Sequence, residues 1–340
     1  MTAEVAFPVT RRQLGAISAG LVSSLIGGGR RAHAEARTAP FPIIADISED
    51  CSRDVGKLAA IGVKVVFRYY ALELQPALPT KRLSKAEADT ILGQGLSLAI
   101  AYQFNNDKLT TFTADRGKKD ADLCLNNGLN VIQQPKGSAI YFGVDGDWPD
   151  AARFGKVITY FETINRAFGD AGNAFEVGVY GSGATCRELK RRGLATHFWM
   201  AGSTGWSGTP GFYNEGSWTL YQSDLELPVG SIRIDSNILN PKIAKIGSFS
   251  LGGKLDDNLD NKSVFESRRF VKRSGVKLLN KPGAEVKRTL KARQIVTALS
   301  TSGAFTEIEA TFPASNSGRS AILHGYCETA SLSAIDKMPG

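Results

Sequence analysis

The 340-residue sequence has few cysteines and histidines, and neither type forms a ligand motif. Cys51, Cys124, Cys186 and Cys327 stand far apart without a CxxC pair, which argues against a cysteine-based metal site. The three histidines are equally scattered, so the pattern supports neither a histidine-based metal site nor a Ser-His-Asp triad. The sequence thus predicts no metal and no cofactor. Four cysteines allow three disulfide pairings, all of which stay open, although Cys124 lies between leucines in a predicted helix and is expected to be a buried thiol.

Long apolar runs and phosphate-binding loops are also absent. No apolar segment reaches the roughly 18 to 20 residues that a membrane span requires, and the mean hydropathy is −0.13. Neither GxGxxG nor GxxxxGK[ST] follows a predicted strand. A hydrophobic fraction of 42% and a charged fraction of 22% are ordinary for a globular protein. We therefore expect no membrane span in the mature protein and no nucleotide-phosphate loop.

The net charge of +8 is unevenly distributed. Residues 1–34 contribute +3 and residues 248–340 contribute +5, whereas residues 35–247 hold 23 basic and 23 acidic residues. A basic surface is the electrostatic signature of nucleic-acid binding. Because the large central region is neutral, the sequence argues against a nucleic-acid partner.

The N-terminus has the order of features of a bacterial export signal. Thr10–Gly15 contains paired arginines, a mildly apolar stretch follows from Leu14 to Ile26, and Ala32–Ala34 is typical of a cleavage site. These features predict a twin-arginine signal peptide over residues 1–34 and a mature protein that is periplasmic or secreted. The alternative is a disordered basic tail.

Residues 35–247 show five strand–helix units followed by three strands without helices. This order predicts an α/β fold with a closed, TIM-like barrel rather than an open sheet. The expected strands cover residues 42–47, 63–69, 96–104, 139–144, 177–180, 197–201, 218–222 and 232–236, and the expected helices cover 53–61, 84–94, 113–127, 149–168 and 184–192.

Two carboxylates follow the fourth of these strands. Asp145 and Asp147 are two positions apart, so a continued strand would place both on the same face. Paired acids at the carboxyl end of a barrel strand are suited to acid/base chemistry. A solvated Asp-Gly-Asp turn is the alternative interpretation.

Other polar and aromatic residues also stand at strand ends, where a barrel builds its site. Several have a structural alternative: a helix N-terminal partner for Asp46, core packing for Tyr180 and the other aromatics, and structural hydrogen bonding for Gln222 and Asp235. The predicted strand-end residues are Asp46, Arg68, Gln103, Tyr180, Gln222 and Asp235, and a sugar-stacking surface is expected from Tyr69, Tyr70, Trp148, Trp199, Trp206 and Tyr221.

The character of the chain changes after residue 247. Residues 248–267 are rich in Gly, Asp and Asn, which predicts a polar linker. Short β-type runs then recur from residue 268 to residue 336, with a turn at Asn280–Gly283. We expect a small all-β domain there.

The central region resembles the glycoside-hydrolase-like domain of twin-arginine-exported bacterial proteins. That domain is itself similar to family 25 glycoside hydrolases, the Chalaropsis-type lysozymes. The resemblance covers about residues 38–247 and rests on Ile44–Ser48, Phe67–Tyr70, Tyr141–Asp147, Val179–Gly181, Trp199, Leu220–Gln222 and Ile234–Asn237. It implies a barrel of five βα units and three final strands, and cleavage of the β-1,4 bond between N-acetylmuramic acid and N-acetylglucosamine.

The resemblance also implies roles for individual residues. Asp147 matches the general acid, which is Glu in the lysozymes, and Asp145 matches its acidic partner. Asp46 and Asp235 match further acids of the cleft. From their strand-end positions and aromatic character, Arg68, Tyr70, Gln103, Tyr180, Trp199 and Gln222 are expected to contact substrate. The last residues resemble a bacterial SH3-type domain near His324–Glu328, a module that often binds peptidoglycan.

Two functions follow from these observations. The first is a glycoside hydrolase acting on peptidoglycan or another cell-wall polysaccharide. The second is a non-catalytic carbohydrate-binding or regulatory wall protein, which is favoured by the shorter Asp at position 147, since acid/base geometry is sensitive to shifts of about 1 Å. An interaction scaffold that uses only the β domain is a third alternative. The sequence does not specify an oligomeric state.

Overall fold

The computed structural model describes residues 40–73, 76–312 and 320–340, and all of them belong to one compact unit. The predicted signal peptide over residues 1–34 lies outside the described residues. Among the described residues, no helix combines the length and the apolar character needed to cross a lipid bilayer.

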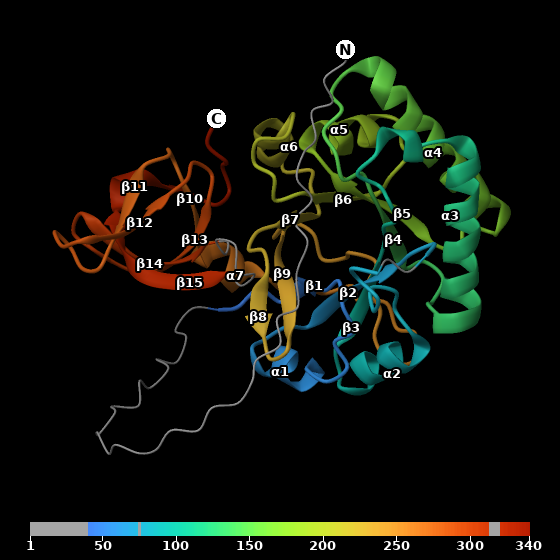
Figure 1. Cartoon of the computed structure of the whole chain (residues 1–340), viewed down its shortest axis with the longest axis horizontal. Helices are drawn as coiled ribbons and strands as arrows, with labels where there is room; N and C mark the ends of the chain where they lie inside the picture. Colours follow the sequence, from blue (N-terminus) through green and yellow to red (C-terminus); the bar gives the residue numbers. More distant parts are fainter. Residues whose placement is uncertain (1–39, 74–75, 313–319) are drawn as a thin grey trace, which may run out of the picture. The chain divides into compact units, whose positions relative to one another are not determined.

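Eight strands close into a barrel (Figure 1). Strands β1 to β7 are parallel in sequence order, and β9 closes the ring by pairing antiparallel with both β7 and β1. Strand β8 pairs with β9 outside the ring. The strands are β1 (Ile44–Asp46), β2 (Val65–Tyr70), β3 (Ser97–Tyr102), β4 (Ala139–Gly143), β5 (Glu176–Gly181), β6 (His197–Met200), β7 (Leu220–Gln222), β8 (Leu227–Val229) and β9 (Ile232–Leu239).

Helices cover the outside of the barrel, and α3 and α4 pack side by side (Figure 1). Half of a capping box starts α2: the Ser84 hydroxyl accepts a hydrogen bond from the Glu87 backbone N–H. The helices that follow the first five strands are α1 (Val55–Ala60), α2 (Lys85–Gly93), α3 (Ala114–Asn126), α4 (Ala151–Asp170) and α5 (Gly183–Arg191).

The expectation that helices cease after the fifth unit was wrong. Helix α6 (Thr209–Glu215) lies between β6 and β7. It has Pro210 in its first turn and left-handed glycines, Gly208 and Gly216, at its two ends. Seven residues between glycines are too few to show helical periodicity in the sequence.

Side chains alternate between the barrel interior and the helix layer. In β2, Val65, Phe67 and Tyr69 belong to the inner cluster, whereas Val66 and Tyr70 pack against the helices. The same alternation holds in the other barrel strands. The inner cluster also contains Ile44, Ala99, Ala101, Ala139, Tyr141, Trp199, Leu220 and Leu239. Strand parity therefore decides which residues can reach a site inside the barrel.

The segment predicted as a linker, residues 248–267, packs on the amino-terminal end of the barrel. Phe249 is buried and exchanges two backbone hydrogen bonds with Leu98, both 2.8 Å long. Just before it, Gly247 accepts a hydrogen bond from the Ala139 N–H, and Ile246 accepts one from the Tyr141 hydroxyl inside the barrel. Helix α7 (Lys262–Ser267) ends the segment. Because the segment is mostly polar, its sequence did not indicate that residues such as Phe249 are buried against the barrel.

The remaining chain forms a seven-stranded antiparallel sheet, distinct from the barrel sheet. The β-type runs expected here cover residues 270–273, 294–299, 305–309 and 320–324. They leave out the short strands β11, β12 and β16, and four of the five residues of β12 are exposed. The resemblance to an SH3-type domain stays a prediction. The strands are β10 (Arg268–Val271), β11 (Val276–Leu279), β12 (Val286–Leu290), β13 (Ile295–Ser302), β14 (Phe305–Phe312), β15 (Ala321–Glu328) and β16 (Leu332–Ala334).

This second sheet is joined to the barrel by buried contacts. The Tyr213 hydroxyl of α6 donates a hydrogen bond of 2.6 Å to the Ile335 carbonyl, and its ring meets Phe270 edge to face. The Arg293 Nη1 donates to the Thr204 carbonyl at 2.8 Å. Because Tyr213 and Phe270 are almost fully buried, these contacts form part of a continuous core.

All four cysteines are buried and unbonded. Burial raises the pKa of each thiol above its ordinary value. Cys124 lies in the core between barrel and helices, which confirms the expected buried thiol. The four thiols are therefore packing residues rather than reactive groups.

Candidate functional site

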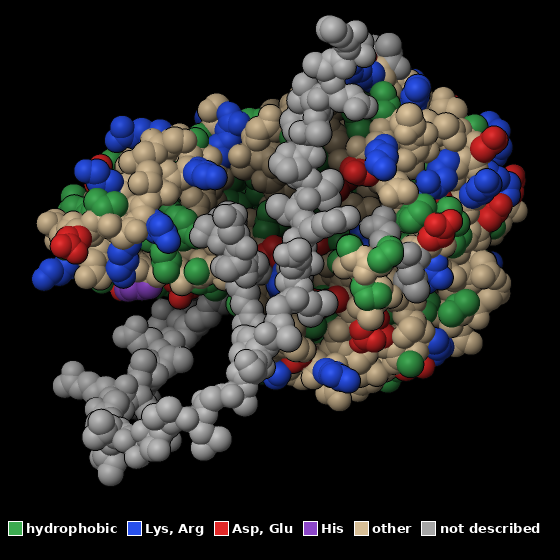
Figure 2. All heavy atoms as spheres, in the orientation of Figure 1, with side chains coloured by type: hydrophobic (Ala, Val, Ile, Leu, Met, Phe, Trp, Pro, Cys, Tyr) green, Lys and Arg blue, Asp and Glu red, His purple; other side chains and the backbone are tan. Residues whose placement is uncertain are grey.

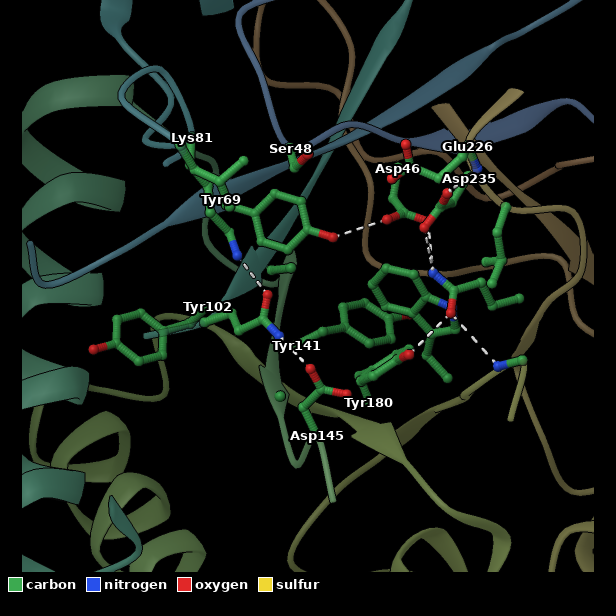
Figure 3. Close-up of a pocket in the computed structure, with 18 of the residues that line it drawn as sticks. Asp46, Ser48, Tyr69, Lys81, Tyr102, Tyr141, Asp145, Tyr180, Glu226 and Asp235 are labelled. Atoms are coloured by element: carbon green, nitrogen blue, oxygen red, sulfur yellow. Dashed lines mark hydrogen bonds between the residues drawn. The ribbon is translucent and has the colours of Figure 1, made fainter. Parts of the chain in front are cut away.

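A cavity of about 400 Å³ opens at the carboxyl ends of the parallel strands. Its volume is that of a typical small-ligand site, and the strands around the barrel each contribute to it. Figure 3 shows carboxylates, tyrosines and Lys81 converging on it. The residues used in the description below are Asp46, Tyr69, Lys81, Gln103, Tyr141, Asp145, Tyr180, Trp199, Gln222, Glu226, Arg233 and Asp235.

Two of the carboxylates, Asp46 and Asp235, face each other where the barrel closes. They are register partners in the antiparallel pair of β1 and β9, so their Cα atoms lie about 4.5 to 5.5 Å apart. The Gln222 amide joins them: its Nε2 donates to Asp46 Oδ2 at 3.4 Å and to Asp235 Oδ2 at 3.1 Å. The two side chains point into the cavity together, beside Glu226 (Figure 3).

The hydrogen bonds distinguish the two members of this pair. Asp46 accepts from three side chains: the Tyr69 hydroxyl at 2.8 Å, the Asn237 amide at 2.9 Å and Gln222. Asp235 accepts from the Glu226 backbone N–H at 2.7 Å besides Gln222. Since hydrogen-bond donors favour the ionised form of a carboxyl group, Asp46 is the better place for the negative charge.

The pKa values of the pair are raised accordingly. Burial raises the pKa of Asp46 to about 6, against the opposing effect of its three donors and the Lys81 charge. Burial and the neighbouring Asp46 charge raise the pKa of Asp235 to about 8. Two carboxyls held this close do not both ionise easily. We infer that near neutral pH the pair holds one proton, mainly on Asp235.

A third carboxylate, Asp145, lies apart from this pair across the cavity (Figure 3). Its Oδ2 accepts a hydrogen bond of 3.0 Å from Gln103 Nε2, and Gln103 Oε1 accepts one of 2.5 Å from Lys81 Nζ. Burial and the Asp107 charge raise the pKa of Asp145, while Lys81 and Gln103 lower it. Burial in turn lowers the pKa of Lys81 to about 8.

Aromatic rings form part of the cavity wall. Tyr180 meets Trp199 edge to face at 4.9 Å, and its hydroxyl donates to Gln222 Oε1 at 2.9 Å. Trp199 Nε1 donates to Asn237 at 2.8 Å, so the ring is fixed from both sides. A rigid wall of this kind can pack against the apolar face of a sugar ring.

Seven of the ten predicted site residues line the cavity. These are the acids Asp46, Asp145 and Asp235 together with Gln103, Tyr180, Trp199 and Gln222. Of the other predicted stacking aromatics, Tyr69 lines the cavity, whereas Trp148, Trp206 and Tyr221 do not.

Arg68 and Tyr70, predicted to contact substrate, lie elsewhere. Strand parity turns both toward the helix layer. Arg68 is fully buried and forms a two-pronged ion pair with Glu87 of α2, at 2.6 and 2.9 Å. The Tyr70 hydroxyl donates to Gln134 at 3.1 Å in the core. Arg68 thus joins β2 to α2, Tyr70 joins it to the segment before β4, and neither residue lines the cavity.

Asp147, predicted as the general acid, is also displaced. Strand β4 ends at Gly143, so its two-residue period does not extend through Asp145 to Asp147. Asp147 does not line the cavity; its Oδ2 accepts hydrogen bonds of 2.9 Å from both the backbone N–H and the hydroxyl of Ser207. In the structure Asp147 thus contacts the loop at Ser207, and its expected role as general acid stays a prediction.

Lys81, Glu226 and Arg233 line the cavity but were not predicted. Lys81 lies between β2 and α2, and its Nζ is 4.7 Å from the centre of the Tyr69 ring. Glu226 lies between β7 and β8 and pairs with Arg233 at 3.0 Å. Side chains alternate between inside and outside along β9, so Arg233 could have been predicted to face the cavity from its spacing to Asp235. No sequence pattern predicts the positions of the two loop residues, Lys81 and Glu226.

The residues that the structure describes include no group of three or more His, Cys, Asp or Glu side chains arranged to hold a metal ion.

Comparison with known proteins agrees with the fold. A family model described as Rv2525c-like, glycoside hydrolase-like domain matches residues 57–237, just over half of the chain. FadG of Bacillus subtilis (strain 168) is 30% identical over 197 residues, which cover 56% of this chain and 34% of FadG. YbfG of the same organism is 31% identical over 187 residues, covering 52% and 25%. The chain thus spans about a third or less of these curated relatives.

Among solved structures, the Tat-secreted protein Rv2525c of Mycobacterium tuberculosis, crystallised with L-tartrate, aligns with a TM-score of 0.50. The identity is 20%, and the alignment covers 61% of this chain and 98% of Rv2525c. This likeness shows the fold. The chain belongs to the family of proteins with an Rv2525c-like, glycoside hydrolase-like domain.

Proposed function

We propose that the cavity binds a glycan and hydrolyses a glycosidic bond, with Asp235 as the general acid. The observation that carries this proposal is the Asp46–Asp235 pair inside a cavity walled by aromatic rings. Glycoside hydrolysis needs a carboxyl group that is still protonated at the working pH and a second one that is ionised.

The pair supplies the protonated group. Because three donors hold Asp46 as the carboxylate, the shared proton resides on Asp235, whose pKa is raised to about 8. That proton is available for the oxygen of the leaving sugar. The negative charge of Asp46 helps to keep it there.

Asp145 is the candidate for the second, ionised group. It lies across the cavity from the pair. Burial raises the pKa of Asp145, and the Lys81 charge and the Gln103 hydrogen bond oppose that rise and favour the carboxylate. A carboxylate in this place can stabilise the oxocarbenium-like transition state or activate the attacking group. Lys81 and Gln103 are positioning residues in this scheme.

The proposed substrate is peptidoglycan or another cell-wall polysaccharide, reached after twin-arginine export to the periplasm or the outside. The paired arginines and cleavage pattern of residues 1–34 support export, as does the description of the similar Rv2525c as Tat-secreted. The second sheet, residues 268–336, is proposed to hold the protein at the wall, in line with its sequence resemblance to SH3-type modules.

A second candidate function is carbohydrate binding without hydrolysis. The observation that favours it is the displacement of Asp147, because the position that corresponds to the lysozyme general acid contacts Ser207 instead of the cavity. In that case the raised pKa values of Asp46 and Asp235 would tune ligand affinity rather than proton transfer.

The test is release of reducing ends by the full chain, from purified peptidoglycan and from neutral N-acetylglucosamine oligomers, between pH 4 and pH 8. We expect Asp235→Asn to lower the rate by about 10²- to 10⁴-fold, the usual contribution of a general acid. Asp147→Asn is the matched control and should stay within a few-fold of wild type. A wild-type chain that sediments with the wall but releases nothing would establish the binding function instead. Full activity in Asp235→Asn would overturn the acid assignment.

A further inference from the structure

A second cavity, of about 210 Å³, lies where the barrel meets the second sheet. On the barrel side it is lined by the loops after β6 and β7, including Thr204 and Asp224. On the other side it is lined by residues around β12, β13 and β14, including Lys291 and Arg293. Both halves belong to the same compact unit.

The two cavities are neighbours. Gly202 and Leu225 line both of them. Gly202 contributes no side chain at this point, and an added Cβ would lie 3.0 Å from the Gln222 carbonyl oxygen. Leu225 is 42% exposed and presents an apolar side chain to both cavities. Gly202 and Leu225 therefore form a shared boundary between the two adjoining cavities.

The charge of the second cavity is positive. Its acid, Asp224, is buried and already engaged by the Ser236 hydroxyl at 2.9 Å and by Arg268 at 3.9 Å. Arg293 donates to two backbone carbonyls, those of Thr204 and Pro339. Within the described part of the chain, no carboxylate lies within 4.0 Å of Lys291 or Arg293, so both cations are uncompensated.

The wider surface has the same sign. Residues 268–340 contain 12 basic and 5 acidic residues. Figure 2 shows mostly Lys and Arg among the charged side chains on the visible face of this sheet. Such a field attracts anionic ligands and polymers.

We propose that the second cavity receives a carboxylate-bearing part of the same glycan chain that occupies the first cavity. This inference rests on the proposed glycan-binding function and adds the chemistry of the neighbouring subsite. Lys291 supplies an exposed ammonium for the carboxylate, Arg293 is a fixed second positive charge, and Tyr221, Leu225 and Ile295 supply apolar surface. The preferred ligand is thus an acidic glycan, such as one bearing free lactyl or peptide carboxylates, rather than a neutral one.

The test compares two forms of one peptidoglycan tetrasaccharide, with free carboxylates and with the carboxylates amidated. Binding to the full chain carrying Asp235→Asn, which prevents turnover, is measured by titration calorimetry. We expect the free acid to bind about tenfold more tightly, the scale of one favourable ion pair. Lys291→Glu should abolish that preference. Lys277→Glu is the matched control, because Lys277 is an exposed lysine of the same sheet that does not line the cavity.

The three possible outcomes lead to different conclusions about the subsite and about hydrolysis. Equal affinity for the two forms, or equal effects of Lys291→Glu and Lys277→Glu, would overturn the subsite while leaving hydrolysis by the first cavity intact. A carboxylate preference that disappears in Lys291→Glu would support it even if the wild-type chain hydrolyses nothing, in which case only the catalytic proposal fails. If neither form binds, the subsite is overturned, and the hydrolysis proposal falls with it only if the wild-type chain also releases no reducing ends.

Discussion

Asp46 and Asp235 lie directly opposite each other where β9 pairs antiparallel with β1 and closes the barrel. Like charges directly opposite in a sheet are destabilising. Here the Gln222 amide donates to both carboxyls, and Asp46 takes two further donors. The result is an asymmetric pair in which one member is stabilised as the carboxylate and the other keeps a proton.

The pair predicts a specific dependence of stability on pH. The pKa values in the folded protein are about 6 for Asp46 and about 8 for Asp235, above the ordinary value of 3.8. The folded state therefore binds more protons than the unfolded state between about pH 4 and pH 8, and this contribution to stability is lost as the pH rises through that window. Asp235→Asn should flatten the pH dependence of the free energy of unfolding, measured in urea at pH 4.5, 6 and 8. The same slope in wild type and variant would contradict the assignment.

The buried ion pair of Arg68 and Glu87 should matter for stability and not for ligand binding. Glu87→Gln leaves the fully buried guanidinium without its counter-charge, so we expect a loss of about 3 to 5 kcal/mol in the free energy of unfolding. The control is Asp89→Asn on the same helix, which breaks the exposed pair with Lys85 and should cost about 0.5 kcal/mol or less. Denaturant melts measure both. Weaker glycan binding by folded Glu87→Gln would restore a substrate role for Arg68.

Gly247 should tolerate no side chain, although it directly precedes a segment of linker-like composition. Its φ is +72°, and an added Cβ would lie 2.2 Å from the Cβ of Ala139. Gly247→Ala combines backbone strain with overpacking and should destabilise by about 1 to 3 kcal/mol or more. Gly252→Ala has a similar φ of +79° but nothing within 4 Å, so thermal melts of the two variants separate the steric effect from the strain. Equal losses would show that residue 247 is not packed against β4.

Lys81 should set the acidic limb of the activity profile. Its charge lowers the pKa of both Asp145 and Asp46. Lys81→Met removes that charge, so the acidic limb of kcat/KM for glycan hydrolysis should move to higher pH, by about one pH unit for loss of a nearby charge. Lys64→Met is the control, because Lys64 is exposed and does not line the cavity. A shift to lower pH, or the same shift in Lys64→Met, would exclude this role.

The barrel was predictable because its strands are short apolar runs bounded by turn residues and helix caps. The site was predictable where a residue ends a strand and has inward parity, as Asp46, Tyr180 and Gln222 do. Arg68 and Tyr70 were misplaced because a strand-end position was considered without parity, which directs Tyr69 inward and its two neighbours outward. A polar residue in β2 does not indicate exposure to the cavity, because the buried guanidinium of Arg68 is paired with Glu87, 19 residues further along the chain.

Loops account for the other errors. Asp147 follows a strand that ends four residues earlier, and Lys81 and Glu226 reach the cavity from connections whose path depends on tertiary packing. Of the two carboxylates of this motif, Asp145 lines the cavity and Asp147 does not, while the catalytic role of either one stays a prediction. No local sequence pattern predicts the hydrogen bond from the Glu226 backbone N–H to Asp235.

The central claim is that Asp46 and Asp235 share one proton near neutral pH inside the cavity. Carboxyl ¹³C NMR of the full chain, labelled at Asp and titrated from pH 3 to pH 10, measures this directly, with Asp46→Asn and Asp235→Asn providing the assignments. We expect two coupled titrations, one near pH 6 and one near pH 8, and a lower pKa for Asp235 in Asp46→Asn, since the neighbouring charge is removed. Two independent titrations near pH 4 would contradict the shared proton and, with it, the assignment of Asp235 as the acid.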